Sequence, residues 1–254
     1  MLSIVIITKN EAHIIGNTLQ SIQGISDDII IVDSGSTDDT IAICKKFNTR
    51  IIETSWDGYG PTKNKGIAAA KYDWIFSLDA DEAVDEELHQ TLLQLKPVEV
   101  NTVYRLRRRS FFCNKLIRYG VWGDDKTTRI FNRNNASWDD AAVHENIIYN
   151  KPENLIELRS GCLLHYTVHN LTDYSTKTIS YARLNAKKYY QQGKKAGFIK
   201  LYLSPTFSFL QYYVFKLGFL DGWEGFLICK TNAWYTFMKY VFLREMNKKG
   251  ENAV

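Results

Sequence analysis

The first 95 residues alternate short apolar runs with longer amphipathic stretches, and this alternation limits the possible folds more than any other feature. Short apolar runs have strand length, whereas apolar residues recurring at i, i+3 and i+4 mark one face of a helix. The β-α-β-α order predicts an α/β fold with a mostly parallel, doubly wound sheet that binds ligands at the carboxyl ends of its strands. The expected strands are Leu2–Ile7, Asp28–Val32, Arg50–Glu53 and Trp74–Leu78, and the expected helices are Glu11–Ile22, Ser36–Phe47 (opened by a capping box), Pro61–Ala70 and Asp85–Leu95.

After Asn101 the pattern changes to shorter strand-like pieces, and from Thr172 onward it is helical. We place the boundary between these regions between His165 and Thr172. The expected strands of the middle region are Thr102–Arg107, Thr128–Phe131, Asn146–Tyr149, Leu155–Leu158 and Cys162–His165. Breaks in the helical region are expected near Gly193, Gly197, Pro205 and Gly222–Gly225.

Charge is divided unevenly along the chain, although the net charge of the 254 residues is only +4. Residues 1–175 carry 19 Lys and Arg against 24 Asp and Glu, whereas residues 176–254 carry 13 against 4. The length suits one large α/β domain with an appendage, or two small domains. The basic second part suggests an anionic surface as its partner.

Cysteine spacing and hydropathy bear on the cellular compartment. The four cysteines lie far apart without a C-x-x-C spacing, which favours free thiols in a reducing compartment over disulfides or a zinc site. The first strand is too short for the apolar core of a signal peptide. The most apolar C-terminal stretch, Leu201–Phe215, falls short of the roughly 18 to 20 apolar residues that span a bilayer. We expect a cytoplasmic protein that does not cross the membrane.

Two carboxylates follow the fourth expected strand in the triplet Asp79-Ala80-Asp81. Residues i and i+2 of an extended chain point to the same side, so both carboxylates should face one point at the strand end. Two hard oxygen ligands suit Mg²⁺ or Mn²⁺ on a nucleotide diphosphate. Because Asp-x-Asp also occurs by chance, the residues at neighbouring strand ends decide its meaning.

Polar residues also follow the first two strands: Thr8, Asn10 and Glu11 after the first, and Asp33 after the second. Asp33 suits a pyrimidine N–H, and the others can contact ribose or base. Helix capping is the alternative for Asn10, but it does not account for an Asp directly after a strand. The chain has no Walker-type or G-x-G-x-x-G loop, which disfavours ATPases and dinucleotide-binding enzymes.

Three N-terminal segments are distinctive: SIVIITKNEAHII, IIIVDSGSTDDT and KNKGIAAAKYDWIFSLDADE. Together they resemble the family-2 glycosyltransferases with the GT-A fold. The motifs DADE, AVHE and GFLDGWEGF resemble the lipopolysaccharide-core β-1,4-glucosyltransferase group within that family. The resemblance implies a GT-A domain over residues 1–168, made of a nucleotide-sugar-binding half (1–100) and an acceptor-side half (101–168) with a small mixed sheet. A basic, aromatic helical region follows over residues 169–254.

The resemblance also implies roles for residues of the first half. Asp33 would read the base of a UDP-sugar, and Asp79 and Asp81 would hold the ribose and a divalent cation, Mg²⁺ or Mn²⁺. Such a cation acts as a Lewis acid by offsetting the charge on departing UDP. Lys63 and Asn64 are expected to contact phosphate or sugar, and a solvated position on the helix is the alternative for Lys63.

A catalytic base is expected in the second half, since inverting transfer needs a carboxylate that takes the acceptor hydroxyl's proton. We choose Glu145, because the resemblance puts its motif in the acceptor region. An ordinary loop acid is the alternative, and His144 is expected to be structural. The rival bases are Asp124, Asp125, Asp139 and Asp140.

Further site residues are expected around these acids. His165 ends an apolar run, and the resemblance makes it a candidate third metal ligand, since imidazole is a competent donor. A structural role is the alternative for His165, and His169 is a weaker candidate. Trp122 and Asp125 are expected on the acceptor side, where Trp122 would stack on a sugar unless it is packed in the core.

The C-terminal helices combine many lysines with aromatic residues. A basic helix with an aromatic face can lie in a membrane interface, where anionic lipid attracts the lysines. The alternatives are packing on the GT-A core or within a dimer. The acidic first half and the lack of a recognised binding module disfavour nucleic acid. One expected helix face carries Trp234, Phe237, Met238, Val241 and Phe242.

Together these features predict a metal-dependent, inverting glycosyltransferase. It would move a hexose such as glucose from a UDP-sugar to a lipid-linked glycan, such as lipopolysaccharide core, at the cytoplasmic face of the membrane. One rival is a sugar nucleotidyltransferase, but the loop after the first strand lacks the glycines that would hold a triphosphate. The other is a non-catalytic, membrane-associated GT-A scaffold, which the intact acids disfavour.

Overall fold

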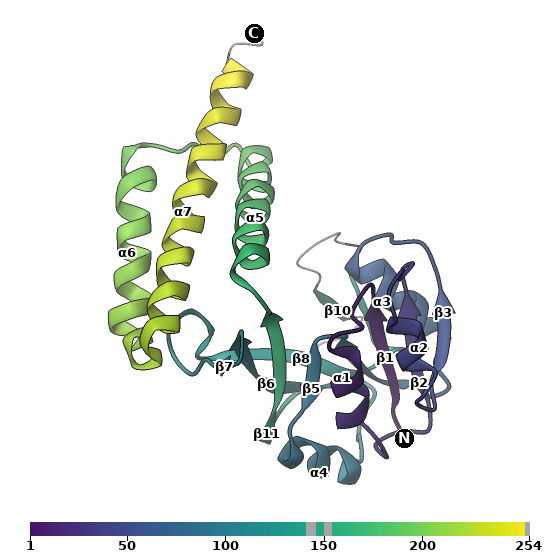
Figure 1. The fold of residues 1–254 in the computed structure, drawn as a ribbon. Helices are drawn as coiled ribbons and strands as arrows, with labels where there is room; N and C mark the ends of the chain where they lie inside the picture. Colours follow the sequence, from purple (N-terminus) through teal and green to yellow (C-terminus); the bar gives the residue numbers. More distant parts are fainter. Residues whose placement is uncertain (141–145, 150–153, 252–254) are drawn as a thin grey trace. The chain divides into compact units, whose positions relative to one another are not determined.

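The computed structural model describes residues 1–140, 146–149 and 154–251, which divide into two compact units (Figure 1). The first, here called the sheet unit, comprises Met1–Arg108 and Asp125–His165. The second, the helical unit, comprises Arg109–Asp124 and Tyr166–Val254. The segment 109–124 therefore groups with the C-terminal helices.

Parallel strands form the first part of the sheet, in the order β3-β2-β1-β4. They are β1 (Ser3–Thr8), β2 (Ile29–Asp33), β3 (Arg50–Glu53) and β4 (Trp74–Asp79). Their carboxyl ends meet at one edge, where Thr8 pairs with Asp33 and Ile7 pairs with Asp79. The predicted parallel core of the fold is confirmed, and it brings the polar strand ends together.

Antiparallel strands continue the sheet in the order β8-β6-β11-β5. They are β5 (Glu82–Val84), β6 (Thr102–Phe112), β8 (Asp125–Asn132) and β11 (Asn154–Val168). A short β7 (Lys115–Leu116) pairs with β6, and β9 (Ala136–Trp138) pairs separately with β10 (Ile147–Tyr149). Pairing of β11 with β5 puts His165 opposite Glu82. The expected mixed sheet is therefore present, although β5, β7 and β9 were not predicted.

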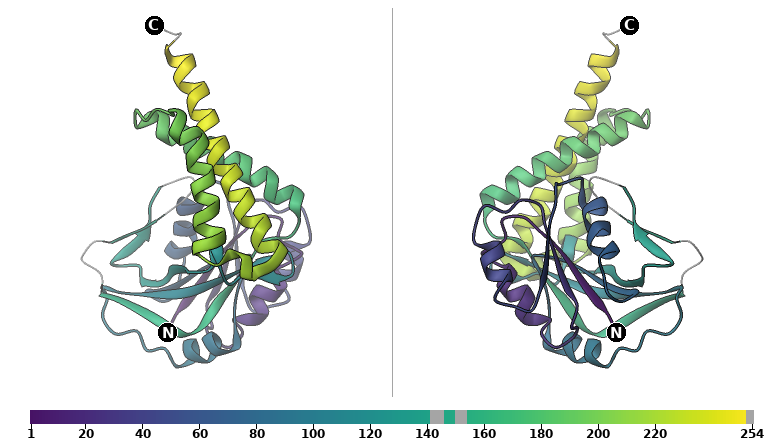
Figure 2. Two further views of the ribbon diagram at one scale, coloured as in Figure 1. Left: turned by 90° about the vertical axis from the view of Figure 1, so that its left-hand side faces the viewer. Right: turned by 90° about the vertical axis from the view of Figure 1, so that its right-hand side faces the viewer.

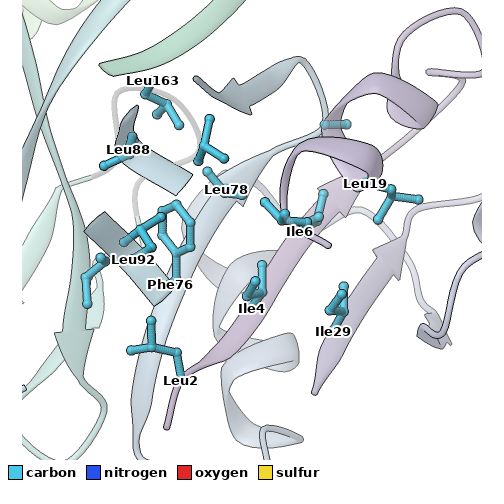
Figure 3. Packing of buried hydrophobic residues seen from close by; sticks show 14 of the residues in the cluster. Leu2, Ile4, Ile6, Leu19, Ile29, Phe76, Leu78, Leu88, Leu92 and Leu163 are labelled. Atoms are coloured by element: carbon cyan, nitrogen blue, oxygen red, sulfur yellow. The ribbon is translucent and has the colours of Figure 1, made fainter. Parts of the chain in front are cut away.

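Alternate residues of the parallel strands fill a core on each face of the sheet. Ile4 and Ile6 point to one face, where they share a cluster with Leu19 of α1 and Leu88 of α4 (Figure 3). Val5 belongs to the cluster on the other face, which α3 covers. Each fully buried aliphatic side chain contributes roughly 1.5–3 kcal/mol. The helices are α1 (Ile15–Ser21), α2 (Thr40–Cys44), α3 (Tyr59–Ala68) and α4 (Glu86–Gln94).

Helix α2 begins at Thr40, later than the predicted capping box at Ser36. The side chains of that segment bond to the neighbouring loop instead. The Ser36 hydroxyl accepts the backbone N–H of Asn10 at 2.9 Å, and the Asp38 carboxylate accepts that of Ala12 at 3.1 Å. The other oxygen of Asp38 accepts the backbone N–H of Thr40, the first residue of α2, at 3.0 Å. Because Ser36 is bonded to the neighbouring loop and not to the first turn of α2, the helix begins later than predicted, and the earlier start was wrong.

Strand β11 is continuous, where two strands, Leu155–Leu158 and Cys162–His165, were expected. Between them Gly161 has a φ of +75°. A Cβ at this position would lie 2.1 Å from the backbone nitrogen of Leu88, the third residue of α4. Glycine permits both the conformation and the close approach of backbone to backbone. It therefore lets α4 pass closely and does not end the strand, and the prediction of two strands was wrong.

The helical unit is built around α7 (Gly222–Glu251), which packs against α5 (Leu171–Gln191) and α6 (Ser204–Leu210) (Figures 1 and 2). Helix α6 is flanked by π-helical turns at Ile199–Leu203 and Gln211–Phe215, so helical backbone is continuous from 199 to 215. The break expected at Pro205 is absent. Pro205 lies where a π-helical turn joins α6, and the change of hydrogen-bond register at such a junction accommodates a residue without an N–H.

A buried carboxylate ties the start of α7 to the 109–124 segment. Asp221 accepts the backbone N–H groups of Arg118 at 3.0 Å and Tyr119 at 2.8 Å. The ammonium of Lys115 donates to the Asp221 carbonyl oxygen at 2.6 Å. Within the described residues, none of the helices combines the length and the apolar content that a membrane span requires.

Candidate active site

Asp79, the last residue of β4, lies between two cations. The Lys63 ammonium is 2.9 Å from one carboxylate oxygen, and the Arg129 guanidinium donates to the other at 2.7 Å. Lys63 is 0% exposed and lies 4.3 Å from the centre of the Trp138 ring. The alternative of a solvated Lys63 is therefore wrong, and its charge is directed to Asp79.

Arg129 also links Asp79 to Glu82, at the start of β5. Its Nη2 donates to Glu82 at 2.6 Å, and both side chains are buried. Arg108 approaches the same Glu82 oxygen at 3.3 Å and donates to Asp125 at 2.7 Å. Buried charges persist only when they are paired in this way. The result is a continuous network of alternating charges beside the strand ends.

The network holds Asp79 in its charged form. Burial alone would raise the pKa of Asp79, but the nearby charges of Arg129 and Lys63 hold it well below its ordinary value. The same pairing acts on Arg129, where burial would lower the pKa and the carboxylates of Asp79 and Glu82 raise it. Both groups therefore stay ionised throughout the physiological range.

Asp81 lies beside His165, as the sequence suggested for the metal site. The Nε2 atom of His165 is 3.4 Å from the carboxylate of Asp81, and both side chains are only partly exposed. Burial would raise the pKa of Asp81, but the hydrogen bond and charge of His165 lower it. Asp81 follows β4 and His165 lies in β11, so the antiparallel pairing of β11 with β5 brings the two together.

The donor atoms of this pair suit a divalent cation bound together with a diphosphate. One carboxylate and one imidazole are competent ligands for Mn²⁺, and such ions often take their remaining ligands from substrate phosphates. Among the described residues, no group of three or more His, Cys, Asp or Glu side chains forms a ready-made metal site. The pair therefore fits a cation whose coordination a substrate completes.

The ends of β1 and β2 offer buried hydroxyls. Thr8 Oγ1 and Ser34 Oγ are both buried, and neither has a hydrogen-bond partner within the described residues. Asp33 is buried as well, and its carboxylate accepts the backbone N–H groups of Gly35 at 3.0 Å and Ser36 at 2.9 Å. Unpaired buried hydroxyls are costly, so these two are suited to a polar ligand. Ser34 was not among the predicted site residues.

Asn10 and Glu11 hold the loop after β1 against the loop after β2. The Asn10 side chain, at a φ of +56°, accepts the backbone N–H of Thr37 at 2.7 Å. The backbone N–H of Glu11 donates to the Thr40 hydroxyl at 2.8 Å. These bonds give both loops a defined conformation. Asn10 does not cap α1, whose N-cap is Ile14, so the capping alternative for Asn10 is wrong, and a contact with a nucleoside stays a prediction.

Asn64 binds protein backbone in this structure. Its amide nitrogen donates to the carbonyl of Trp138 at 2.8 Å, and its side-chain oxygen accepts the N–H of Trp138 at 3.1 Å. This two-way bond fixes the end of β9 against α3. The predicted contact of Asn64 with phosphate or sugar finds no support in this geometry, since both ends of the amide are engaged.

Comparison with known proteins identifies the family of the chain. The model of glycosyl transferase family 2 matches residues 3–153, more than half of the chain. The chain belongs to glycosyl transferase family 2. Its sequence is 31% identical over 249 residues to the lipopolysaccharide core biosynthesis glycosyltransferase LpsC of Rhizobium meliloti, covering 93% of this chain and 89% of LpsC.

One further relative and one solved structure are similar to the chain over most of its length. An uncharacterized glycosyltransferase of Rickettsia prowazekii is 28% identical over 270 residues, covering 100% of this chain and 90% of the relative. Among solved structures, S. aureus TarS superposes with a TM-score of 0.46 and 13% identity, covering 96% of this chain and 55% of TarS. The family resemblance inferred from the motifs is confirmed, and the protein is a glycosyltransferase.

The two residues that were predicted on the acceptor side of this family-2 enzyme, Trp122 and Asp125, lie in different environments. Asp125 pairs with Arg108, as described above. Trp122 belongs to the helical unit, where its ring lies 6.1 Å from that of Phe112 and 6.0 Å from that of Tyr174. The packing alternative for Trp122 matches this environment, and stacking on a sugar stays a prediction.

The predicted base, Glu145, lies outside the described residues, as does His144. The rivals Asp139 and Asp140 directly follow β9, whose position Asn64 fixes. Sequence reasoning missed Glu82 and left Arg129 without an assignment. Glu82 stands in the DADE motif, and that position was the available signal for it.

Proposed function

We propose that the protein transfers a hexose, such as glucose, from a UDP-sugar to a hydroxyl group of a lipid-linked glycan, with inversion at the anomeric carbon. The observation that carries the proposal is the Asp81–His165 pair next to an ionised Asp79 at the strand ends of a family-2 chain. This arrangement offers cation ligands beside a position for a diphosphate.

The nucleoside would lie over the ends of β1 and β2. The unpaired hydroxyls of Thr8 and Ser34 are suited to hydrogen bonds with ribose or base. The loop whose backbone N–H groups bond to Asp33 would form the base of this nucleoside site. A pyrimidine has N–H and carbonyl groups that can use these partners. The assignment of Asp33 to the base and of Asn10 and Glu11 to the nucleoside belongs to this proposal.

Asp81 and His165 would hold a divalent cation, Mg²⁺ or Mn²⁺. When bound, such an ion supplies Lewis-acid stabilisation of the charge on the departing diphosphate. Asp79 would then act as the anchor of the site instead of a ligand, since Lys63 and Arg129 already hold both of its carboxylate oxygens. Its fixed position orients the turn that carries Asp81.

Transfer requires one bond to form and one to break at the anomeric carbon. The acceptor oxygen attacks, the bond to UDP breaks with its electron pair on the diphosphate oxygen, and a carboxylate takes the hydroxyl proton. We assign that carboxylate to Glu145, with Asp139 and Asp140 as alternatives. Trp122 and Asp125 stay proposed contacts on the acceptor side.

The proposed acceptor class is supported by the likeness to LpsC, a protein named for lipopolysaccharide core biosynthesis. A glycan on a lipid would place the reaction at a membrane surface, and the basic C-terminal part suits an anionic one. We therefore propose that the enzyme works at the cytoplasmic face of the membrane on an envelope glycan.

A donor screen tests the proposal. Release of UDP from a panel of UDP-hexoses and calorimetric binding of UDP would be measured with and without EDTA, for the wild type, Asp81→Ala and Glu145→Gln. We expect EDTA and Asp81→Ala to abolish metal-dependent UDP binding, whereas Glu145→Gln keeps binding and loses turnover. Glu99→Gln, an exposed loop acid, is the matched control.

Two outcomes would contradict parts of the proposal. Release of pyrophosphate from a nucleoside triphosphate, with no UDP release from any donor, would favour a nucleotidyltransferase. Full activity of Glu145→Gln would move the base to another carboxylate, and Asp140→Asn would be tested next.

A further inference from the structure

The helical stretch from 199 to 215 has apolar side chains on two faces. The inner face packs on α7, where the rings of Phe209 and Tyr213 lie 6.0 Å and 5.7 Å from that of Phe226. The Ser208 hydroxyl accepts a bond from Asn232 of α7 at 2.9 Å. The position of this stretch along α7 is visible in Figure 2. These contacts account for one side of the stretch only.

The outer face carries an exposed apolar stripe made of Ile199, Leu203, Phe207, Leu210 and Val214. Successive members are separated by four, four, three and four residues, so they recur about once per helical turn. Phe207 is 64% exposed. A stripe with this spacing normally faces a protein core. Here it faces away from α7.

A second exposed group, the apolar tip, lies at the turn between α6 and α7. Its members are Phe215, Leu217, Phe219, Leu220 and Trp223. Phe215 is 75% exposed and Trp223 is 68% exposed. Contiguous apolar patches on this scale mark interaction sites for proteins or membranes, whereas single exposed apolar residues are ordinary.

The charged residues around the stripe and the tip are basic, which favours an anionic partner. Between residues 174 and 220 the sequence has eight Lys and Arg and no Asp or Glu. Lys194, Lys195 and Lys200 are exposed at the start of the stripe, and Lys216 is exposed at the tip. The next acid, Asp221, is buried and accepts backbone N–H groups, so its charge does not balance them.

We propose that the stripe and the tip insert into the interface of an anionic lipid bilayer, with the four lysines on the headgroups. Burial of apolar side chains and attraction to anionic lipid together drive such binding. Trp223 and Tyr202 suit the interface, because their rings combine an apolar body with a polar edge. A second copy of this chain fits less well, since it would bring two sets of the same lysines together. This proposal rests on the proposed function in one respect: a lipid-linked acceptor would require the enzyme to work at a membrane.

Vesicle flotation of the full chain, without donor or acceptor, tests this proposal. The vesicles would contain phosphatidylcholine either alone or mixed with phosphatidylglycerol. We expect the wild type to bind the mixed vesicles and to bind them more weakly at high salt. The variant Leu203→Glu/Phe207→Glu should bind roughly tenfold more weakly or worse. The triple change of Lys194, Lys195 and Lys200 to Gln should lose roughly tenfold on mixed vesicles only.

Matched controls lie on the sheet unit. Val98→Glu introduces an acid at an exposed apolar residue, and Lys45→Gln/Lys46→Gln removes two exposed lysines. Both should bind vesicles like the wild type. Calorimetric binding of UDP with Mn²⁺ separates this proposal from the proposed function, because the two measurements can fail independently.

A conservative variant, Trp223→Phe, tests the proposal even if the acidic substitutions prevent folding. Brominated lipids should quench the tryptophan fluorescence of the wild type, and Trp223→Phe should reduce that quenching. The proposal is overturned if the wild type does not bind the mixed vesicles, or if Trp223→Phe leaves quenching unchanged. It is also overturned if Leu203→Glu/Phe207→Glu converts a lipid-free dimer to monomer, as measured by sedimentation velocity, while vesicle binding stays unchanged.

Discussion

A single nitrogen of Arg129 joins Asp79 to Glu82, at 2.7 Å and 2.6 Å. The bond connects the end of β4 to the start of β5, which are the two sides of the turn that carries Asp81. The guanidinium therefore sets the shape of that turn. Because Glu82 has no exposure to solvent, loss of Arg129 would leave a buried charge partly unpaired.

Arg129→Met should lower the free energy of unfolding by about 3–5 kcal/mol, the range for breaking one side of a buried ion pair. Urea unfolding followed by circular dichroism measures this change. Arg108→Met is the control: its side chain is more exposed and it meets Glu82 at 3.3 Å, so the loss should be smaller. Equal losses of unfolding free energy would show that the contact of Arg129 with both acids stabilises the fold no more than the contact of Arg108 with Glu82.

His165→Ala should weaken Mn²⁺-dependent binding of UDP about tenfold or more, since it removes one of two proposed protein ligands. Isothermal titration calorimetry in the presence and absence of Mn²⁺ gives the readout. His169→Ala, four residues along the chain and exposed, should bind like the wild type. Unchanged Mn²⁺ dependence in His165→Ala would assign His165 a structural role.

Asn64→Ala should reduce turnover while leaving the KM for the donor within about twofold, because the amide holds the backbone of Trp138. Two lost hydrogen bonds should also cost about 1–3 kcal/mol of stability. Steady-state kinetics with a varied donor concentration separates the two parameters. A large rise in KM with unchanged turnover would instead support the contact with the donor predicted from the sequence.

Asp28 gives the stability a dependence on pH. Burial would raise its pKa, but bonds from the Ser3 hydroxyl, the Lys71 amide and the Arg50 guanidinium lower it. A lowered pKa in the folded state stabilises the fold above the ordinary value of about 3.9, and this contribution disappears as the pH falls through the folded pKa. The difference in unfolding free energy between the wild type and Asp28→Asn should therefore be constant near neutral pH and shrink below about pH 4. Urea titrations at several pH values measure it, and a difference that grows with acidity would contradict the assignment.

The parallel core could be predicted from the sequence because each of its strands has a local pattern of apolar residues. Apolar runs gave the strands Arg50–Glu53 and Trp74–Leu78 almost to the residue, and strand order placed Asp33 and Asp79 at one edge. The capping box failed, because the Ser36 hydroxyl bonds to a loop that is distant in sequence instead of to the first turn of α2. Contacts of this kind have no local pattern.

The same reason explains what was missed at the site. The role of Arg129 depends on β8 lying beside β4, a pairing between residues about fifty positions apart. A lysine on a helix is usually solvated, yet Lys63 is buried because Asp79 and the Trp138 ring surround its ammonium. Only the folded sheet brings these groups together.

The middle residue of the Asp79-Ala80-Asp81 triplet is constrained differently from its neighbours. Ala80 belongs to the main core cluster and is 5% exposed, and its carbonyl accepts the Thr18 hydroxyl of α1 at 2.6 Å. The outer positions are constrained by the charges around them, whereas the middle position is constrained by the space available to its side chain. A larger side chain there would push the turn away from α1 and separate the two carboxylates without altering either of them.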